Sequence, residues 1–346
     1  MKVRHEELFD FIEQVLDARD VPTEASRDVA AGLVDASLRG IDSHGVRLLP
    51  HYVEELDANR VSRSSDHSLN QTGPSTAILD ADHGFGHWAG MKGTQTAADL
   101  AIASGAGIVA VKNSNHFGAC SFYTIELADH GMIGISMTHS DSLVVPTNGI
   151  RAFLGNNPIS IAVPCADEDP ICLDMATSKI TFNEVLKRRE EGIEAPSQTG
   201  VDGDGNETTN PDEIKHLLPV GGYKGYGLGV MIEILCAILT EMDFGPHLTK
   251  MYDDDIGETR NLGHFFIAID IDRFTSLDRF ETRVQSLVDE LRAEPRKGDQ
   301  SIRVPGDPEK EERALRIEEG IPLRNIDVQK LDTLAERHSL SMPESV

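Results

Sequence analysis

The sequence has little positive charge for its length. Its 346 residues contain 58 Asp and Glu but only 32 Lys and Arg, which gives a formal net charge of −26. Nucleic acids and anionic membranes repel such a surface because both are polyanions, so we expect neither as a partner. The acidic residues are spread along the chain. We interpret them as a halophilic adaptation, because salt screens self-repulsion; an ordinary acidic cytoplasmic protein is the alternative.

Cysteine patterns typical of metal modules or disulfide scaffolds are also missing. The chain has four cysteines, and no two of them form a C-x-x-C pair. Their spacing matches no zinc module, so we expect no metal site. Buried thiols in a reducing cytoplasm are the favoured interpretation.

Long apolar runs are absent as well. The longest apolar stretch, residues 226–240, is interrupted by Glu233 and is too short to span a bilayer comfortably. The first seven residues are too charged for a signal peptide. We therefore expect a cytoplasmic protein that does not cross a membrane.

The first part of the chain has helical periodicity. Apolar residues recur at helical spacing over residues 5–18 and again from Pro22 to about Gly40. Ser43 is a candidate N-cap for a third helix that runs through Leu56. We predict a helical subdomain over residues 1–74, with residues 63–74 as a boundary loop. The helices expected within residues 300–346 would join it.

Strands and helices are mixed from residue 75 onward. This mixture predicts an α/β or α+β core over residues 75–299, containing the cofactor and substrate sites. The expected strands cover residues 76–80, 107–112, 133–138, 160–164, 170–174 and 264–271. The expected helices cover residues 88–104, 122–130, a long segment after Gly225, and 276–293.

Two local motifs resemble known binding loops but fit them poorly. Residues 84–89 match the dinucleotide pattern G-x-G-x-x-A, yet the next strand ends in Lys112-Asn113 and lacks the acidic residue that would hold a ribose. We favour a tight strand-to-helix turn. Residues 202–213 resemble a calcium loop, but Glu207 replaces the turn glycine, which favours an acidic turn.

Three other segments carry side chains suited to redox chemistry on a hydroxy acid. The glycine-rich residues 221–229 precede an apolar helix, and Lys224 adds a positive charge, a pattern that favours phosphate binding. His116 follows the strongest predicted strand and is suited to proton transfer. His44 and Arg47 form a second cluster, in which the arginine is suited to clamping a carboxylate.

Taken together, these motifs resemble the type 2 malate/L-lactate dehydrogenase family over nearly the whole chain. The resemblance rests on residues 39–45 (RGIDSHG), 113–118 (NSNHFG), 155–158 (GNNP), 173–178 (LDMATS), 222–227 (GYKGYG), 263–266 (GHFF) and 305–306 (PG). It implies a non-Rossmann α/β architecture with a mixed sheet. It also implies a homodimer with its active site near the subunit contact.

The resemblance further implies an NAD(P)-dependent oxidoreductase that interconverts a small 2-hydroxy acid and its 2-oxo acid. It places His116 and His44 at the reacting centre, with His116 as the first choice for proton donor. The cofactor, NAD or NADP, would be held by Asp174, Met175, Ala176, Thr177, Lys224, Gly225, Gly306, Asp307 and Pro308.

Details within the family lean toward ureidoglycolate dehydrogenase. Residues 140–141, 251–254 and 260–263 resemble that enzyme's segments, which implies that Ser140 and Asn261 touch substrate. The family usually has its arginine one position after Arg47, where this chain has Leu48. A one-residue shift turns a helical side chain by about 100°. A non-catalytic ligand-binding homologue is therefore kept as an alternative.

Overall fold

The computed structural model describes residues 1–252 and 254–346. Asp253, part of the resemblance at residues 251–254, lies outside the described residues. The chain begins with a short strand, β1 (Lys2–Val3), and two helices, α1 (His5–Asp17) and α2 (Thr23–Leu38). Two 3₁₀ turns, η1 (Asp42–His44) and η2 (Val46–Leu48), lead into α3 (Leu49–Asp57).

A seven-stranded mixed sheet forms the centre of the molecule. Its strand order is β2-β3-β4-β11-β5-β6-β7, in which only β3 and β4 pair in parallel. The bounds are β2 (Ser68–Gly73), β3 (Thr76–Asp80), β4 (Ala106–Ser114), β5 (Met132–Thr138), β6 (Ile159–Val163), β7 (Ile171–Met175) and β11 (Leu262–Asp270). This mixed sheet confirms the predicted α/β class and differs from the parallel sheet of a Rossmann fold.

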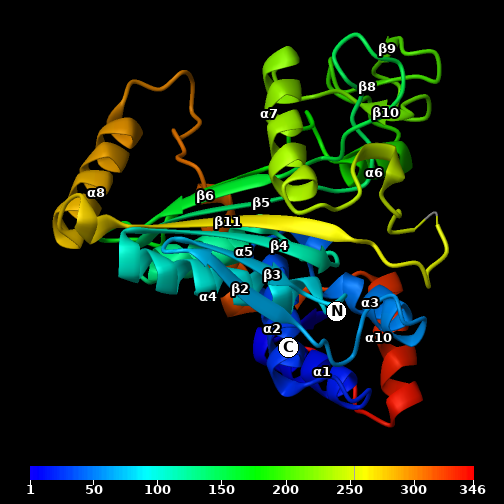
Figure 1. Ribbon diagram of the computed structural model, residues 1–346. Coiled ribbons are helices and arrows are strands. Elements are labelled where there is room, and N and C mark those ends of the chain that lie inside the picture. Colours follow the sequence, from blue (N-terminus) through cyan, green and yellow to red (C-terminus); the bar gives the residue numbers. More distant parts are fainter. Residues whose placement is uncertain (253) are drawn as a thin grey trace.

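Helices cover both faces of this sheet. Figure 1 shows α4 (Gly86–Ser104) and α5 (Cys120–Asp129) on one face and α7 (Tyr223–Glu233) on the other. After α7 the chain continues into a π-helical turn, η3 (Ile234–Ile238), which packs on β11. A smaller part contains α6 (Phe182–Glu191) and a three-stranded sheet of β8 (Gly200–Val201), β9 (Glu207–Thr208) and β10 (His216–Leu217). Two further 3₁₀ turns, η4 (Gly245–His247) and η5 (Ile271–Arg273), lie on either side of β11.

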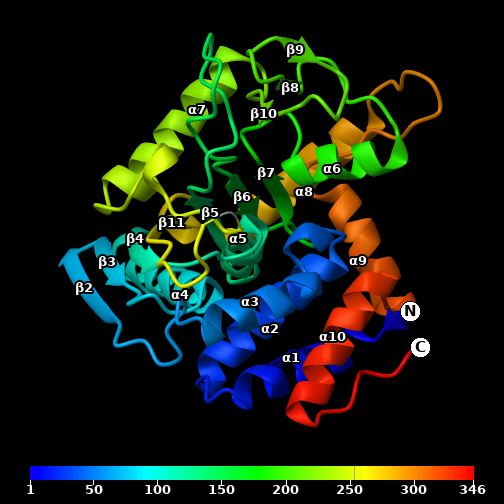
Figure 2. The same ribbon diagram turned by 90° about the vertical axis from the view of Figure 1, so that its right-hand side faces the viewer.

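The C-terminal part returns to the N-terminal helices. After α8 (Leu277–Ala293), the helices α9 (Asp307–Glu319) and α10 (Asn325–His338) pack against α2 and against α1 and α3, respectively (Figure 2). β12 (Ile321–Pro322) pairs with β1. Arg316 of α9 donates to the carbonyl of Ser37 at 2.7 Å. One apolar core also runs from the N-terminal helices into β3 and β4, so the division into two domains stays a prediction.

Three sequence predictions need correction. Residues 68–73, predicted as a boundary loop, form the edge strand β2, whose exposed side chains leave no apolar pattern to detect. The predicted Ser43 cap is wrong, because extended Gly45 separates two 3₁₀ turns and α3 begins at Leu49. Helix α6 was not predicted because, of its ten residues, only Val185 is buried.

The glycine turn at residues 84–86 has a packing role. A Cβ on Gly86 would lie 2.3 Å from the carbonyl oxygens of Asn115 and His116, so only glycine lets α4 begin there. Trp88, on the first turn of α4, is buried, and its ring centroid lies 4.8 Å from that of His67. The turn therefore fixes α4 against the segment that carries His116.

Among the described residues, none of the helices combines the length and apolar character that a bilayer crossing requires.

Candidate active site

One edge of the central sheet collects most of the residues predicted to bind substrate or react. β4, β5 and β7 end at this edge, whereas β6 and β11 begin there, because β11 is antiparallel to β4 and β5 and β6 is antiparallel to β5 and β7. The residues next to these strand ends, which we call the polar edge, are His116, Ser140, Asn157, Thr177 and Asn261. Side chains far apart in the sequence are thus brought to one side of the molecule.

The two predicted catalytic histidines lie together. The ring centroids of His44 and His116 are 5.4 Å apart and the rings are stacked. Nδ1 of His116 lies 2.6 Å from the Tyr52 hydroxyl, and Nδ1 of His44 lies 2.8 Å from Ser43 Oγ. No described residue forms a hydrogen bond with Nε2 of His116, so this nitrogen is available for a ligand.

Burial sets the protonation of both rings. It lowers the pKa of His44 to about 4, with a further contribution from the Arg47 charge. The pKa of His116 also lies well below its usual value, first because of burial and then because of His44 and Arg260. Both imidazoles are therefore neutral at pH 7, and His116 is a base with one free nitrogen.

Arg47 faces a large cleft whose lining includes Ser43 but neither His44 nor His116. The cleft has a volume of about 850 Å³ and is lined by residues that include Arg47, His51 and Tyr252. Arg47 is half-buried and forms no ion pair with any described residue. Leu48, which occupies the family's usual arginine position, is buried in the core. Lys187, Arg324, Lys330 and Arg337 also line the cleft, so Arg47 is one of several cations that face it.

The two predicted substrate contacts are held by their neighbours. Ser140 Oγ accepts a hydrogen bond from the backbone N of Asn156 at 3.0 Å. Asn261 has a left-handed backbone with φ 50°, and its side-chain amide donates to Asp243 at 3.3 Å. Next to them, the buried Arg260 pairs with Asp141. The structure places Ser140 and Asn261 at the polar edge but shows no contact of either with His116.

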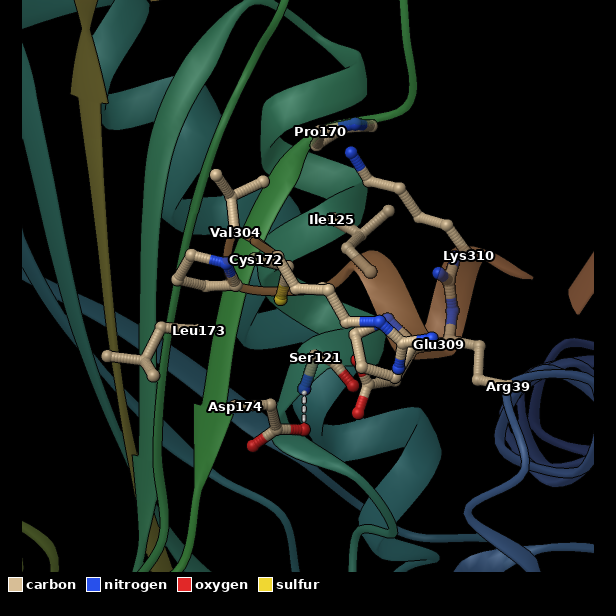
Figure 3. A pocket seen from close by; sticks show the side chains of 14 residues that line it. Arg39, Ser121, Ile125, Pro170, Cys172, Leu173, Asp174, Val304, Glu309 and Lys310 are labelled. Atoms are coloured by element: carbon tan, nitrogen blue, oxygen red, sulfur yellow. Dashed lines mark hydrogen bonds between the residues drawn. The ribbon is translucent and has the colours of Figure 1, made fainter. Parts of the chain in front are cut away.

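A second pocket, of about 360 Å³, contains several of the predicted cofactor residues (Figure 3). Asp174, Gly306 and Pro308 line it together. Asp174 accepts a hydrogen bond from the backbone N of Ser121 at 2.9 Å, and burial raises the pKa of its carboxyl group. Gly306 has φ 95°, and a Cβ there would lie 3.2 Å from the Cys172 carbonyl. The Asp174 carboxyl group and the Gly306 backbone thus line one pocket, and Cys172 leaves little room for a side chain at position 306.

The other predicted cofactor residues have different surroundings. The hydroxyl of Thr177 donates to the Asn156 carbonyl at 2.8 Å. The Asp307 carboxylate accepts from Arg292 and from the backbone N of Val304, so its side chain stabilises the start of α9. Met175 ends β7 and Ala176 follows it, both partly exposed.

Lys224 and Gly225 lie on the first turn of α7. The two glycines before this helix have φ 62° and 64°, and a Cβ on either would have open space around it. Lys224 is exposed and pairs with no described carboxylate. The turn is tied to the polar edge, because Val220 N donates to the Thr177 carbonyl at 2.8 Å. Within one chain, however, no contact joins Lys224 to the histidine pair.

Comparison with known proteins decides the family. The model of the malate/L-lactate dehydrogenase family matches residues 3–332. The chain is 36% identical to malate dehydrogenase of Pyrococcus abyssi, over 97% of this chain and 95% of that protein. This chain belongs to the malate/L-lactate dehydrogenase family.

Other relatives and solved structures agree with this assignment. The chain is 36% identical to ureidoglycolate dehydrogenase (NAD(+)) of Escherichia coli K12, over 88% of each chain. The solved structure of sulfolactate dehydrogenase from Methanocaldococcus jannaschii superimposes with a TM-score of 0.93 at 32% identity, covering 99% of this chain and 98% of that one. The predicted family and architecture are therefore confirmed.

Tyr52 and Arg260 act on His116 but are not among the predicted site residues. Tyr52 lies within the third predicted helix, which runs through Leu56, and its hydroxyl bonds His116. Arg260 was noted only within a family-like segment, yet its charge reaches His116. A buried tyrosine or arginine requires a hydrogen-bond partner, which was the available signal.

Residues 202–206 form the acidic turn that the sequence favours, because Asp202 Oδ1 accepts hydrogen bonds from the backbone N of Asp204 and of Asn206.

Proposed function

We propose that this chain is an NAD(P)-dependent oxidoreductase that interconverts a small 2-hydroxy acid and the corresponding 2-oxo acid. The observation that carries the proposal is the pairing of His116 with His44 and Tyr52, together with the unpaired Arg47, whose charge acts on His44. These groups supply a proton-transfer nitrogen and a carboxylate clamp, the two functions that such a substrate requires of the protein.

His116 moves the proton at Nε2. In the oxidation direction, neutral His116 takes the hydroxyl proton of the 2-hydroxy acid on Nε2, while Nδ1–H donates to Tyr52 Oη. In the reduction direction, the imidazolium returns that proton from Nε2 to the oxygen on C2. Tyr52 keeps the same partner in both states, so it fixes the ring and confines proton transfer to one nitrogen. His44 is the alternative proton donor.

Arg47 is proposed to bind the substrate carboxylate through paired hydrogen bonds. Ser140 and Asn261 are proposed to contact the rest of the substrate from the polar edge. A nicotinamide cofactor, when bound, accepts or supplies the hydride. Asp174 to Thr177, Lys224, Gly225 and Gly306 to Pro308 are proposed to hold it, supported by the pocket that Asp174, Gly306 and Pro308 line together and by the open glycine backbone before Lys224.

A panel assay tests the function. The purified protein is mixed with NADH or NADPH and a series of 2-oxo acids at high KCl, and absorbance of the nicotinamide is followed. We expect loss of absorbance with at least one pair, which also decides between the two cofactors. A fluorescence change without loss of absorbance would instead indicate the non-catalytic ligand-binding homologue.

Ureidoglycolate is the second candidate substrate. Support comes from the relative of that name at 36% identity and from the resemblance at residues 140–141 and 260–263. Ureidoglycolate with NAD is therefore included in the oxidation arm of the panel. If it is the substrate, its kcat/KM will exceed those of malate and lactate.

We also propose a homodimer that works in a salty cytoplasm. An exposed apolar face follows α7 and η3, formed by Tyr223, Met231, Ile234, Ile238 and Leu239, and it supports contact with a second copy. Light scattering should give twice the chain mass. The charge of −26 supports salt adaptation, in which case Tm rises with KCl; a flat or falling curve contradicts it.

A further inference from the structure

A buried carboxylate lies behind the polar edge. Glu233, at the end of α7, is 5% exposed. Its Oε2 accepts a hydrogen bond from Asn157 Nδ2 at 2.6 Å, and its Oε1 accepts one from the backbone N of Gly245 at 2.7 Å. Oε1 also lies 3.9 Å from His139 Nδ1. Burial alone would raise the pKa of this carboxyl, but His139 and the hydrogen bonds hold it below its ordinary value.

Asn157 connects this carboxylate to the end of β5. While its amide nitrogen donates to Glu233 and to the Gly229 carbonyl, its Oδ1 accepts from the backbone N of Ser140 at 3.2 Å. Asn157 is fully buried, so each of these bonds is expensive to leave unmade. The orientation of the amide is therefore determined, and with it the position of the Ser140 backbone.

His139 connects the same carboxylate to the start of β11. Its Nε2 lies 2.8 Å from the backbone N of Gly263, which donates to it. An acceptor nitrogen has no proton, so the neutral ring must carry its proton on Nδ1, the nitrogen that faces Glu233. The carboxylate thus favours the one tautomer that can hold Gly263, as carboxylates do for histidines at metal sites.

We infer that Glu233 is a positioning residue for the substrate side of the polar edge, acting through Asn157 and His139. Ser140 follows His139 directly, and Asn261 precedes Gly263 by two residues. Glu233 touches neither proposed substrate contact, but its two connections hold the segments that carry both. The inference rests on the proposed function for its link to substrate, whereas the connections themselves do not depend on it.

The direction of the hydrogen bonds makes the inference testable. Both oxygens of Glu233 accept, and both well-defined partners donate. A glutamine at this position has one acceptor and one donor end, so it must face either Asn157 or Gly245 with the wrong group. An aspartate at position 157 would place two carboxylates 2.6 Å apart, which favours a shared proton. The pair Glu233→Gln and Asn157→Asp reverses the bond between the two side chains and removes both conflicts there, while the aspartate still faces the Gly229 carbonyl that the amide donated to, so the expected recovery is partial.

The kinetic experiment compares Glu233→Gln, Asn157→Asp and the double variant, with exposed Glu241→Gln as the matched control. We expect Glu233→Gln to raise KM for the 2-oxo acid about tenfold, equivalent to about 1.4 kcal/mol, with the NADH Kd within about twofold of wild type. Asn157→Asp should lose more activity than Glu233→Gln. As the pH falls, its activity relative to wild type should partly recover. At pH 7 the double variant should be more active than Asn157→Asp. An unchanged KM in Glu233→Gln, or no recovery in the double variant, overturns the inference.

A second readout does not require turnover. In ¹⁵N-histidine NMR spectra, the His139 signal, assigned by its loss in His139→Asn, should show the proton on Nδ1. Glu233→Gln should shift this signal, whereas Glu241→Gln should not. A proton on Nε2 in the wild type overturns the inference even in an active enzyme. If the wild type reduces no 2-oxo acid, the proposed function fails, and an Nδ1 proton that responds to Glu233 still supports the connection.

Discussion

Two groups of histidines in this molecule share a low pKa and differ in access. Burial lowers the pKa of both His87 and His264 to about 3, as it lowers those of His44 and His116. His264 uses both ring nitrogens, at 2.8 Å from Thr138 Oγ1 and Ser114 Oγ. His116 uses only one, toward Tyr52. The main cause of the depressed pKa is burial in both groups, so it does not distinguish them, whereas one fixed and one free nitrogen indicate proton transfer.

The largest expected effect is at His44 and His116, which we call the open pair. His116→Ala removes the proton-transfer nitrogen, which typically contributes about 10²- to 10⁴-fold in rate. We expect kcat to fall by that factor, while the NADH Kd from fluorescence titration and the Tm change little. Near-normal turnover would assign the proton to His44, and His44→Ala is the companion variant that decides.

His87 and His264, which we call the closed group, should affect the stability of the fold and not the rate of the reaction when they are substituted. His264→Leu leaves the buried Ser114 hydroxyl without its partner and disturbs the stacking on Phe117, whose ring centroid lies 4.3 Å away. We expect the free energy of unfolding to fall by about 3 kcal/mol, measured by urea titration. The variant that remains folded should keep kcat within a few-fold. A stable but inactive His264→Leu variant would show that the closed group also takes part in the reaction, and it would contradict this comparison.

Arg47 tests whether the open pair has a substrate partner. Arg47→Ala removes a cation that no described carboxylate neutralises, so little stability should be lost. Charged hydrogen bonds contribute about 1.5–3 kcal/mol, and we expect KM for the 2-oxo acid to rise roughly 10- to 100-fold. The exposed Arg151→Ala is the matched control. Equal KM values in the two variants would remove Arg47 from the site.

The smallest effect separates the members of the closed group. His87 is 1% exposed, and neither ring nitrogen has a hydrogen-bond partner among the described residues. Its pKa in the folded chain, about 3, lies below the ordinary 6.5, so the unfolded chain binds an extra proton between these values. The contribution of neutral His87 to the free energy of unfolding is therefore fully present above pH 6.5 and is lost as the pH falls toward 3. His87→Leu should reduce this slope by about 1.4 kcal/mol per pH unit, measured by urea titrations from pH 4 to 7. An unchanged slope would show that His87 is charged in the folded chain.

Periodicity in the sequence predicted most of the fold, whereas the site residues are a prediction from motifs. The apolar residues of β4 and the stripe of α1 were clear because one side of each element is buried. β2 and α6 were missed because backbone pairing and charged surfaces leave no apolar pattern. The proposed catalytic pair, His116 and His44, was predicted from motifs that resemble the family, and the structure brings the two rings together.

Glu233 shows why the rest of the site could not be predicted. In the sequence it is only an interruption of an apolar stretch, since its partners lie at residues 139, 157 and 245. A buried carboxylate implies that it has partners, but the sequence does not show which segments supply them. Tyr52 could not be predicted for the same reason. Its position in a helix predicts that the side chain is buried but does not identify the hydrogen-bond partner of its hydroxyl.

Trp88 gives this molecule a built-in optical probe. It is the only tryptophan in the sequence, and it lies on the helix that starts against the carbonyl of His116. Its emission overlaps the absorption of reduced nicotinamide, so energy transfer from this one indole would report binding from a single known origin. Cofactor titrations can therefore be read without a label, in the native chain and in every variant named above.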